Sequence, residues 1–410
     1  MKEENLPPLR RDLEFFPLSH QGKQLLLVRD HLGLVPEGIT VEIPLYQLMT
    51  MLDGATTLRD LQMTLMRESG GMLVSSDEVQ SLIAQLDDSF ILASEKFVRE
   101  KERLVADFLA MKTRPSCLSG RAYPAEPREL TAKLEEILAL EDSPKPPGKT
   151  LALVAPHIDL ASGARIYARA YRALRGASPK TVIIIGIGHR MAEGLFALSD
   201  KDFATPLGVA ECDRRQVEKL RLAAGAVMAK DDFVHRDEHS VEFQILFLQH
   251  VLPKDSFRIV PLLCGSPQIA LGEYSRRAYR EKAGPLLEAL QDILAQEGGE
   301  VLVVAGVDFS HTGPKFGHEL PAHSLQRRSE AHDRALLEAL AERNADAFWE
   351  ESRKVKDQYN VCGFAALACL LEVLPACQGH ILGYEIWHEE ATRSAVSYAA
   401  LAFTERTSRS

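Results

Sequence analysis

The sequence predicts an α/β protein in which helices cover both faces of a mostly parallel central sheet, as a three-layer sandwich. Three apolar runs carry this prediction, at residues 151–154, 181–185 and 301–305. Uninterrupted runs rich in β-branched residues are typical of strands buried on both faces, and such strands belong to parallel sheets. Helical patterns alternate with these strands at 163–175, 213–223 and 238–251. This alternation indicates a layered α/β fold.

The remaining elements of the larger domain complete the layers. A strand is expected at 258–264, and two closing strands at 381–387 and 395–403. Further helices are expected at 128–140 and 363–374. Together they predict one α/β domain over residues 106–410.

Residues 1–105 are expected to form a separate small α+β domain, because 410 residues are too many for one ordinary core. Short strands are expected at 24–29 and 41–45, and helical patterns follow at 45–52, 57–66 and 75–86. The helix at 75–86 begins at a Ser/Asp cap. A charged helix at 95–112 is expected to lead into the larger domain.

Composition excludes some classes of protein. The net charge of −10 argues against a nucleic-acid-binding protein. No stretch approaches the roughly 18 consecutive apolar residues of a membrane span. The acidic N-terminus lacks the basic and apolar regions of a signal peptide. The six cysteines include no Cys-x-x-Cys pair, as expected for reduced thiols in the cytoplasm.

Side chains that can bind a metal follow the predicted strands. His157 and His189 come directly after the first two apolar runs, and Asp308 and His311 come after the third. Cys362 stands just before the helix at 363–374. Ligands of open α/β sheets gather outside the carboxyl ends of the strands. We therefore predict that His157, His189 and Cys362 bind one transition metal ion, with His311 as a nearby base.

The predicted ligand set leaves the metal open among iron, copper and zinc. Imidazole suits all three, and a thiolate favours copper(I) or zinc. Alternatively, Cys362 only packs in the core at the start of its helix, as we expect of Cys369. His311 is either an acid/base near neutral pH or a hydrogen-bond partner of Asp308.

A competing pattern is His235-Arg236-Asp237-Glu238-His239, which matches the His-x-x-Glu-His motif of zinc peptidases. On one helix, His235 and His239 would share a face and bind zinc, with Glu238 as base. The segment from Asp237, however, has the pattern of a helix start. We therefore expect His235 to lie in a loop, and rank a zinc metallopeptidase below the other functions.

The chain resembles the Memo family, known as protein B of the AmmeMemoRadiSam system, over about residues 115–405. The resemblance depends on the number, order and spacing of short motifs. They are Gly120 to Pro124, Ala155-Pro156-His157, Gly186 to His189, Thr205 to Gly208, Glu238 to Gln244, Ile259 to Leu263, Val307 to His311, Val361-Cys362-Gly363 and Tyr398 to Phe403.

This resemblance implies the fold of the class III extradiol ring-cleaving dioxygenases. Matching the motifs makes His157 and His189 the imidazole ligands and puts Cys362 where the dioxygenases have a glutamate. His311 takes the place of the acid/base histidine and, with Asp308, is the predicted catalytic pair.

Two further residues are predicted to line the pocket. His239 falls in a motif that lines the pocket in the family. Asp159 stands where the family has a different sequence, Ala-Gly-Tyr in place of Ile158-Asp159-Leu160. Asp159 either adds a carboxylate to the pocket or caps the following helix.

The pattern of residues 1–105 resembles PqqD-type winged-helix domains, which bind peptides; the alternative is a small cap that packs against the rest. The family association implies radical-SAM and Ammecr1-type partners. Two functions follow as expectations. The first is a metal-dependent, dioxygenase-like oxidoreductase acting on a small or peptide-borne substrate. The second is a non-catalytic protein that binds a metal or a peptide as a partner of a radical-SAM system.

Overall fold

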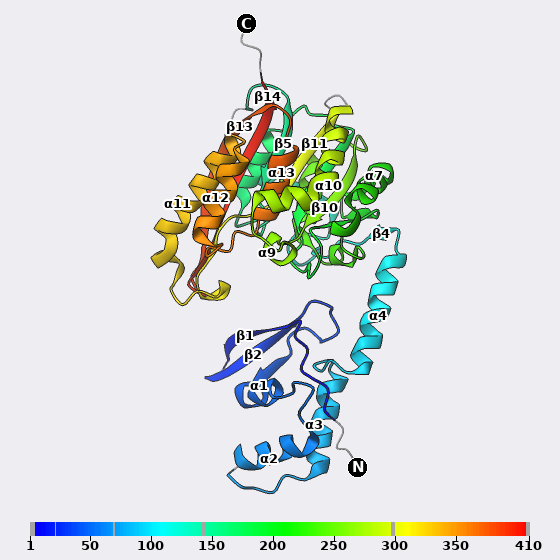
Figure 1. The fold of residues 1–410 in the computed structure, drawn as a ribbon, viewed down its shortest axis with the longest axis vertical. Coiled ribbons are helices and arrows are strands. Elements are labelled where there is room, and N and C mark those ends of the chain that lie inside the picture. Colours follow the sequence, from blue (N-terminus) through cyan, green and yellow to red (C-terminus); the bar gives the residue numbers. More distant parts are fainter. Residues whose placement is uncertain (1–4, 21, 69, 142–144, 297–299, 407–410) are drawn as a thin grey trace. The chain divides into compact units, whose positions relative to one another are not determined.

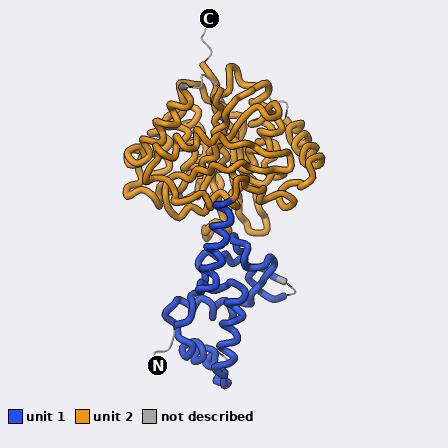
Figure 2. The backbone as a smooth tube through the Cα atoms, turned by 90° about the vertical axis from the view of Figure 1, so that its right-hand side faces the viewer, with its two compact units in different colours: residues 1–110 blue, residues 111–410 orange. Residues whose placement is uncertain are grey.

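The computed structural model describes all residues except 1–4, 21, 69, 142–144, 297–299 and 407–410. The chain divides into two compact units, Met1–Ala110 (unit 1) and Met111–Ser410 (unit 2) (Figure 2). The predicted boundary at 105/106 therefore falls inside helix α4 (Glu95–Ala110).

Unit 1 is an α+β structure with an antiparallel sheet in the order β1-β2-β3, followed by helices. Its elements are β1 (Leu13–His20), β2 (Lys23–Asp30), β3 (Thr40–Glu42), α1 (Ile43–Thr50), α2 (Leu58–Glu68), α3 (Ser76–Asp88) and α4. The strand predicted at 41–45 ends early, because Pro44 lies in the first turn of α1, where proline is preorganised for a helix. Strand β1 was not predicted, and Pro17 interrupts its strand pattern. The winged-helix resemblance stays a prediction.

Two groups of polar contacts stabilise parts of unit 1. Ser75 and Glu78 form a capping box that begins α3, since each side chain accepts the other residue's backbone N–H. The guanidinium of Arg10 is buried between the carboxylates of Asp12 and Asp30. A separate hydrophobic core, which includes Leu61 and Val79, fills the space between the sheet and the helices.

Within the described residues, unit 2 has an eight-stranded mixed sheet (Figure 1). The strands run in the order β12-β14-β5-β11-β6-β10-β7, and β13 pairs with β14. Their bounds are β5 (Thr150–Ala155), β6 (Thr181–Ile187), β7 (Phe196–Leu198), β10 (Arg258–Cys264), β11 (Val301–Gly306), β12 (His311–Thr312), β13 (Cys377–Glu389) and β14 (Ser394–Glu405). The four strands β5, β11, β6 and β10 are mutually parallel, whereas β7, β12, β13 and β14 pair antiparallel. The α/β class is confirmed, but the sheet is mixed and not mostly parallel, because the closing strands form a hairpin.

Helices cover both faces of this sheet and complete three layers. One core contains side chains of α7, α10, α11, α12 and α13, and a second contains those of α5, α6 and α8. The bounds are α5 (Pro127–Ala139), α6 (Ala164–Arg172), α7 (Arg214–Ala224), α8 (His239–Val251), α9 (Pro267–Ala270), α10 (Arg276–Gln296), α11 (Ala322–Ala341), α12 (Ala345–Val355) and α13 (Phe364–Val373). Neighbouring residues of β5 point to opposite cores: Ala152 and Val154 to the first, Leu153 and Ala155 to the second.

A second, small sheet in the order β4-β8-β9 pairs the first strand of unit 2 with two strands at 202–210. It is formed by β4 (Thr113–Arg114), β8 (Asp202–Thr205) and β9 (Gly208–Ala210). Three short 3₁₀ helices, at Gly225–Val227, Phe233–His235 and Pro314–Phe316, complete the described elements of this unit.

The start of α8 packs directly against the ends of two strands. A Cβ atom on Gly306 would lie 2.4 Å from the backbone oxygen of Ser240, and one on Gly186 would lie 2.5 Å from its hydroxyl oxygen. Glycine at both positions permits this approach. The Ser240 hydroxyl also accepts the backbone N–H of Ile187 at 2.9 Å. The residues that begin α8 are thereby brought beside the ends of β6 and β11.

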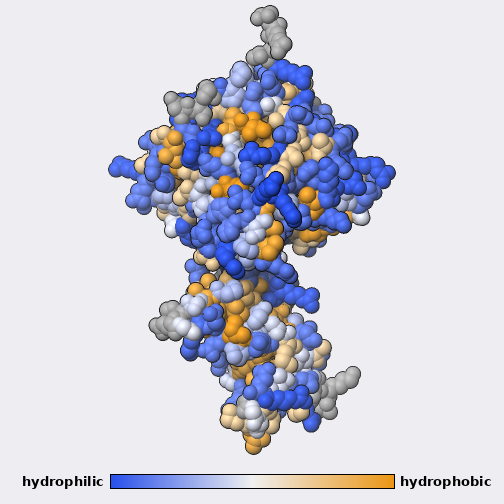
Figure 3. All heavy atoms as spheres, turned by 90° about the vertical axis from the view of Figure 1, so that its left-hand side faces the viewer, coloured by the Kyte–Doolittle hydropathy of each residue, from blue (hydrophilic) through white to orange (hydrophobic). Residues whose placement is uncertain are grey.

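The visible surface of unit 2 is mostly hydrophilic (Figure 3). Among the described residues, none of the helices combines the length and apolar character that a membrane crossing requires.

We predict that residues 1–110 and 111–410 each fold alone, because each unit has its own core. Leu61→Ala removes a fully buried side chain from the core of unit 1 and should lower its unfolding free energy by about 2–5 kcal/mol. In the full chain, urea unfolding followed by circular dichroism should show that only one transition shifts. If Leu61→Ala shifts the unfolding of both units equally, they are one cooperative structure.

Candidate metal centre

Strand register brings the predicted residues to one edge of the sheet. Ala155 pairs with Gly306 and Ala305 pairs with Ile185, so β5, β11 and β6 end at the same level. His157, Asp308 and His189 follow these three strands. Cys362 does not follow a strand; it lies at the turn before α13. Residues distant in sequence therefore meet where the sheet ends.

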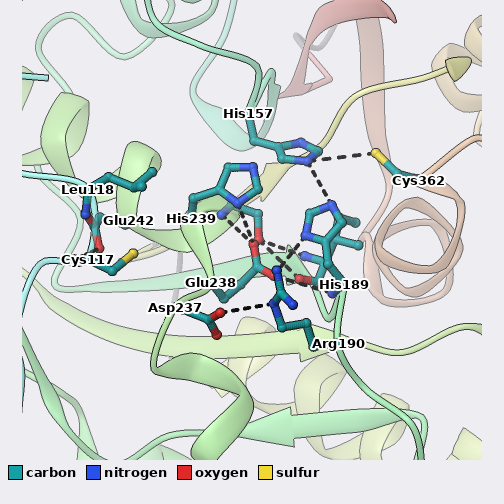
Figure 4. Close-up of polar contacts among 12 residues, drawn as sticks. Cys117, Leu118, His157, His189, Arg190, Asp237, Glu238, His239, Glu242 and Cys362 are labelled. Carbon is teal, nitrogen blue, oxygen red and sulfur yellow. Dashed lines mark hydrogen bonds and ion pairs between the residues drawn. The ribbon is translucent and has the colours of Figure 1, made fainter. Parts of the chain in front are cut away.

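His157, His189 and Cys362 converge on one point (Figure 4). The Nε2 atoms of the two imidazoles are 3.3 Å apart, and the Cys362 sulfur lies 3.9 Å from Nε2 of His157. The three donor atoms all lie within 4.8 Å of one another. Two ligands at roughly 2.0–2.3 Å from a tetrahedral ion are separated by about 3.3–3.8 Å, so this spacing suits one bound ion.

A second group, His189, Glu238 and His239, also brings its donor atoms within 4.8 Å. Here the carboxylate already has partners: one oxygen accepts Nδ1–H of His189 at 2.9 Å, and the other accepts the N–H of Ser240 at 2.8 Å. A carboxylate on the far nitrogen of a metal-binding histidine fixes its tautomer and leaves the other nitrogen free for an ion. Glu238 therefore orients His189 toward the point shared with His157 and Cys362.

His157 has a corresponding carboxylate in Asp308. One oxygen of Asp308 accepts the backbone N–H of His157 at 3.0 Å, and the other lies 3.7 Å from its Nδ1. This second distance is too long for a hydrogen bond, and the buried Nδ1 has no other partner among the described residues. Asp308 thus holds the backbone at His157 and faces the ring nitrogen that lies away from the convergence point.

The two carboxylates differ in acidity. Burial raises the pKa of Asp308 to about 7, although backbone hydrogen bonds from His157 and Ile158 oppose this. Burial also opposes ionisation of Glu238, but the adjacent charge of His189 and its hydrogen bond hold the pKa of Glu238 well below its usual value. Glu238 is therefore the charged partner at neutral pH.

Burial and Glu238 together shift the protonation of the donor groups. Burial lowers the pKa of His189, but the charge and hydrogen bond of Glu238 outweigh it and raise that pKa above its usual value. Burial lowers the pKa of His157 well below its usual value, which leaves the imidazole neutral and able to ligate. Burial raises the pKa of Cys362 well above its usual value, so its sulfur is a thiol that donates weakly to the Asp308 carbonyl at 3.6 Å. A cation beside this sulfur would stabilise the thiolate.

His311 lies in β12, next to this edge, and its ring is partly exposed. Its Nδ1–H donates to the Phe309 carbonyl at 3.0 Å and not to Asp308, and its ring also forms a hydrogen bond with the backbone of Asn360. Burial lowers the pKa of His311 to about 4, so the neutral ring can accept a proton.

The two predicted pocket residues have different surroundings. His239 begins α8, with its ring centroid 5.1 Å from those of both His157 and His189, so it lies beside the centre. Asp159 is exposed, and its side chain accepts the N–H groups of Ala161 and Ser162. Asp159 therefore caps the turn before α6 and does not add a carboxylate to the centre.

His235 is separate from the centre. It lies on the 3₁₀ helix Phe233–His235, whereas His239 begins α8, so the two histidines do not share one helix face. Its buried Nε2–H donates to the Ala197 carbonyl at 3.1 Å. The arrangement required for a His-x-x-Glu-His peptidase is therefore absent from this segment.

Sequence reasoning did not assign Glu238 to His189. It treated Glu238 only as the base of a peptidase motif or as part of the Glu238 to Gln244 match. A usable signal was present, because an acidic residue at a helix start accepts N–H groups and is thereby held in one orientation. Which histidine it would meet depends on the packing of α8 against β6.

Comparison with known proteins points to one family. The family model described as Memo-like protein matches residues 114–402. A MEMO1 family protein of Aquifex aeolicus is 28% identical over 399 residues, covering 96% of this chain and all of the relative. The MEMO1 family protein MK0963 of Methanopyrus kandleri is 28% identical over 306 residues, covering 71% of this chain and 98% of the relative. An uncharacterized protein of Escherichia coli K12 aligns at 13% identity with a TM-score of 0.38, covering 62% of this chain and 99% of that one, which is too low to bear on the fold or function.

The burial of His235 predicts a loss of stability in acid. Burial lowers the pKa of His235 to about 4, although its bond to the Ala197 carbonyl opposes this. As the pH falls from about 6.5 toward 4, the unfolded chain binds a proton at this residue that the folded protein does not. The stabilising contribution, complete above about pH 6.5, should fall by about 2 kcal/mol between pH 7 and pH 5.

His235→Gln tests this prediction, because glutamine keeps an N–H donor for Ala197 and does not titrate. Urea unfolding at pH 7, 6 and 5 should show a free-energy difference between wild type and variant that shrinks as the pH falls. A difference that is constant across this range would show that His235 is already free to protonate in the folded protein.

Proposed function

This chain belongs to the family of Memo-like proteins, and we propose that unit 2 binds a transition metal ion through His157, His189 and Cys362. The observation that carries the proposal is the convergence of two imidazole nitrogens and a sulfur within 4.8 Å. Two features favour an ion over a structural cluster. The ring nitrogen of His189 that faces away from the convergence point is bonded to Glu238, and that of His157 lies 3.7 Å from a carboxylate oxygen of Asp308. Among the described residues, the Nε2 atoms contact each other and the sulfur.

The donor set fits a soft or borderline ion. Two imidazoles and a thiolate suit copper(I) or zinc, and iron(II) is also held by imidazole. Binding would displace the proton that Glu238 favours on His189. A bound ion would act as a Lewis acid and, if it were iron or copper, would also supply redox chemistry. The chain contributes the orientation of the rings, through Glu238 on His189 and Asp308 at His157.

We further propose that the centre serves a metal-dependent oxidoreductase, related in fold to class III extradiol dioxygenases, with a small or peptide-borne substrate. In this role His311 is the acid/base, because burial keeps its ring neutral at the edge of the sheet where the centre lies. The position of the centre at the ends of parallel strands supports this function, since α/β enzymes bind substrates there.

A second candidate is a non-catalytic protein that holds a metal or a peptide for a radical-SAM system, with Ammecr1-type partners. The presence of a sulfur ligand favours it, because dioxygenases of this type use two histidines and a carboxylate. The PqqD-like resemblance of unit 1 is consistent with peptide binding. Oxygen consumption by the iron-loaded protein with catechol-type substrates separates the two functions: turnover that is lost in His311→Gln supports the enzyme.

A zinc peptidase ranks below both, because His235 donates to a backbone carbonyl and lies off helix α8.

Cys362→Ala tests the metal proposal directly. Loss of the sulfur should weaken copper(I) and zinc binding by more than the roughly 10–100-fold that loss of an orienting residue causes. Cys362→Glu restores a carboxylate and should shift the preference toward iron(II). Competitive titration of each ion against a chelator measures both effects.

Cys369→Ala is the matched control, because Cys369 is a fully buried core residue of α13. It should lower stability and leave metal affinity unchanged. Equal affinities of wild type and Cys362→Ala for copper(I) and zinc would reduce Cys362 to a packing residue and refute the proposed ligand set.

A further inference from the structure

A fully buried arginine contacts the segment that leads into α8. Arg114 ends strand β4 and its side chain has no exposed surface. Its Nε donates to the carbonyl of His235 and one terminal nitrogen donates to the carbonyl of Glu238, both at 2.7 Å. The other terminal nitrogen donates to the carboxylate of Glu242. The planar guanidinium thus holds two backbone carbonyls and one carboxylate at once.

Glu242 fixes the opposite side of this contact. It lies in the first turn of α8 and is almost fully buried. Its oxygens also accept the N–H groups of Cys117 at 2.9 Å and Leu118 at 3.0 Å, and the hydroxyl of Tyr123 at 2.5 Å. Figure 4 shows Cys117, Leu118 and Glu242 grouped beside the centre. Segment 114–123 is therefore joined to the start of α8 through one ion pair.

The carbonyls that Arg114 holds belong to the segment that leads into α8. Residues 236–238 lie between the 3₁₀ helix and α8, where no regular helical ladder fixes the backbone. The carbonyl of Glu238 is held by Arg114, and its side chain is held by His189 and by Ser240. Arg114 thus determines where the backbone of Glu238 lies relative to His189.

We propose that Arg114, paired with Glu242, is a positioning residue of the metal centre. It acts through Glu238, which it holds so that the carboxylate remains on Nδ1 of His189 and Nε2 faces the ion. The test of this inference by metal affinity rests on the proposed metal-binding function. It adds residues of segment 114–123 to a centre whose ligands all lie elsewhere in the sequence.

The alternative is that the Arg114–Glu242 pair only stabilises the fold. Removing two charges from water is costly, and apolar residues of similar size often stabilise a core at least as well. A buried pair is better explained where its directional hydrogen bonds orient something. Here a hydrogen bond of Arg114 is directed at the backbone carbonyl of Glu238, the residue that orients His189.

The test compares Arg114→Lys with Arg10→Lys. Lysine keeps the charge but cannot hold the three acceptors in one plane. Arg10 is the matched control, because it is a buried arginine paired with two carboxylates in unit 1. With Co²⁺ as the probe, Arg114→Lys should raise the Kd by about 10–100-fold. The sulfur-to-cobalt absorption band should change shape, and Arg10→Lys should leave both unchanged.

A second readout does not depend on a metal. In the metal-free protein at alkaline pH, where His189 is neutral, imidazole ¹⁵N NMR should show its proton on Nδ1 in the wild type and in Arg10→Lys. Arg114→Lys should lose this single tautomer. If Arg114→Lys does not fold, Tyr123→Phe, which removes one hydrogen bond from Glu242, should shift the Co²⁺ affinity and the tautomer in the same directions by less.

Each result decides between the explanations. The positioning role is overturned if folded Arg114→Lys keeps the wild-type Co²⁺ affinity and His189 tautomer. If Arg114→Lys does not fold, the same result with Tyr123→Phe overturns it. If wild type binds no Co²⁺, the metal proposal fails, and the tautomer measurement still decides whether Arg114 positions Glu238.

Discussion

Parallel pairing brings the ends of β5, β11 and β6 to one level, because Ala155 lies opposite Gly306 and Ala305 opposite Ile185. The site depends on this register. A slip of one residue would move a ligand by about 3.3 Å along its strand and turn its side chain to the other face. That displacement is comparable to the whole separation of 3.3 Å between Nε2 of His157 and Nε2 of His189. Burial of these strands in two cores, which fixes the register, therefore also assembles the centre.

Much of this arrangement could be predicted from short patterns, and the reasons for the failures are physical. The apolar runs before His157 and His189 predict buried strands, and buried parallel strands end together. The sequence could not show that the closing strands form an antiparallel hairpin, because a buried run carries no sign of its partner's direction. The role of Glu238 was missed because it depends on how closely α8 packs against β6, which glycine at position 186 permits. Arg114 was missed because an arginine is expected at the surface unless its partner, here Glu242, is known.

The electrostatics of the centre favour a cation. The pKa of the buried Glu238 is held well below its usual value, mainly by His189, and burial raises the pKa of Asp308 to about 7. Both face imidazoles and not arginine or lysine. Buried negative charge of this kind is costly without a compensating positive charge, part of which His189 supplies, since Glu238 raises its pKa. A cation held between the histidines would compensate it and would favour the thiolate of Cys362, so that metal affinity and proton release from the cysteine are coupled.

Two relatives differ in how much of this chain they match. The alignment with the Methanopyrus kandleri protein covers 98% of that protein but only 71% of this chain, a length close to that of unit 2. The Aquifex aeolicus relative instead matches 96% of this chain, which requires residues of both units. His157, His189, Cys362 and their carboxylates all belong to unit 2. The proposed ligands therefore all lie outside unit 1. The chain runs from the end of α4 at Ala110 to Arg114, whose side chain donates a hydrogen bond to the carbonyl of Glu238.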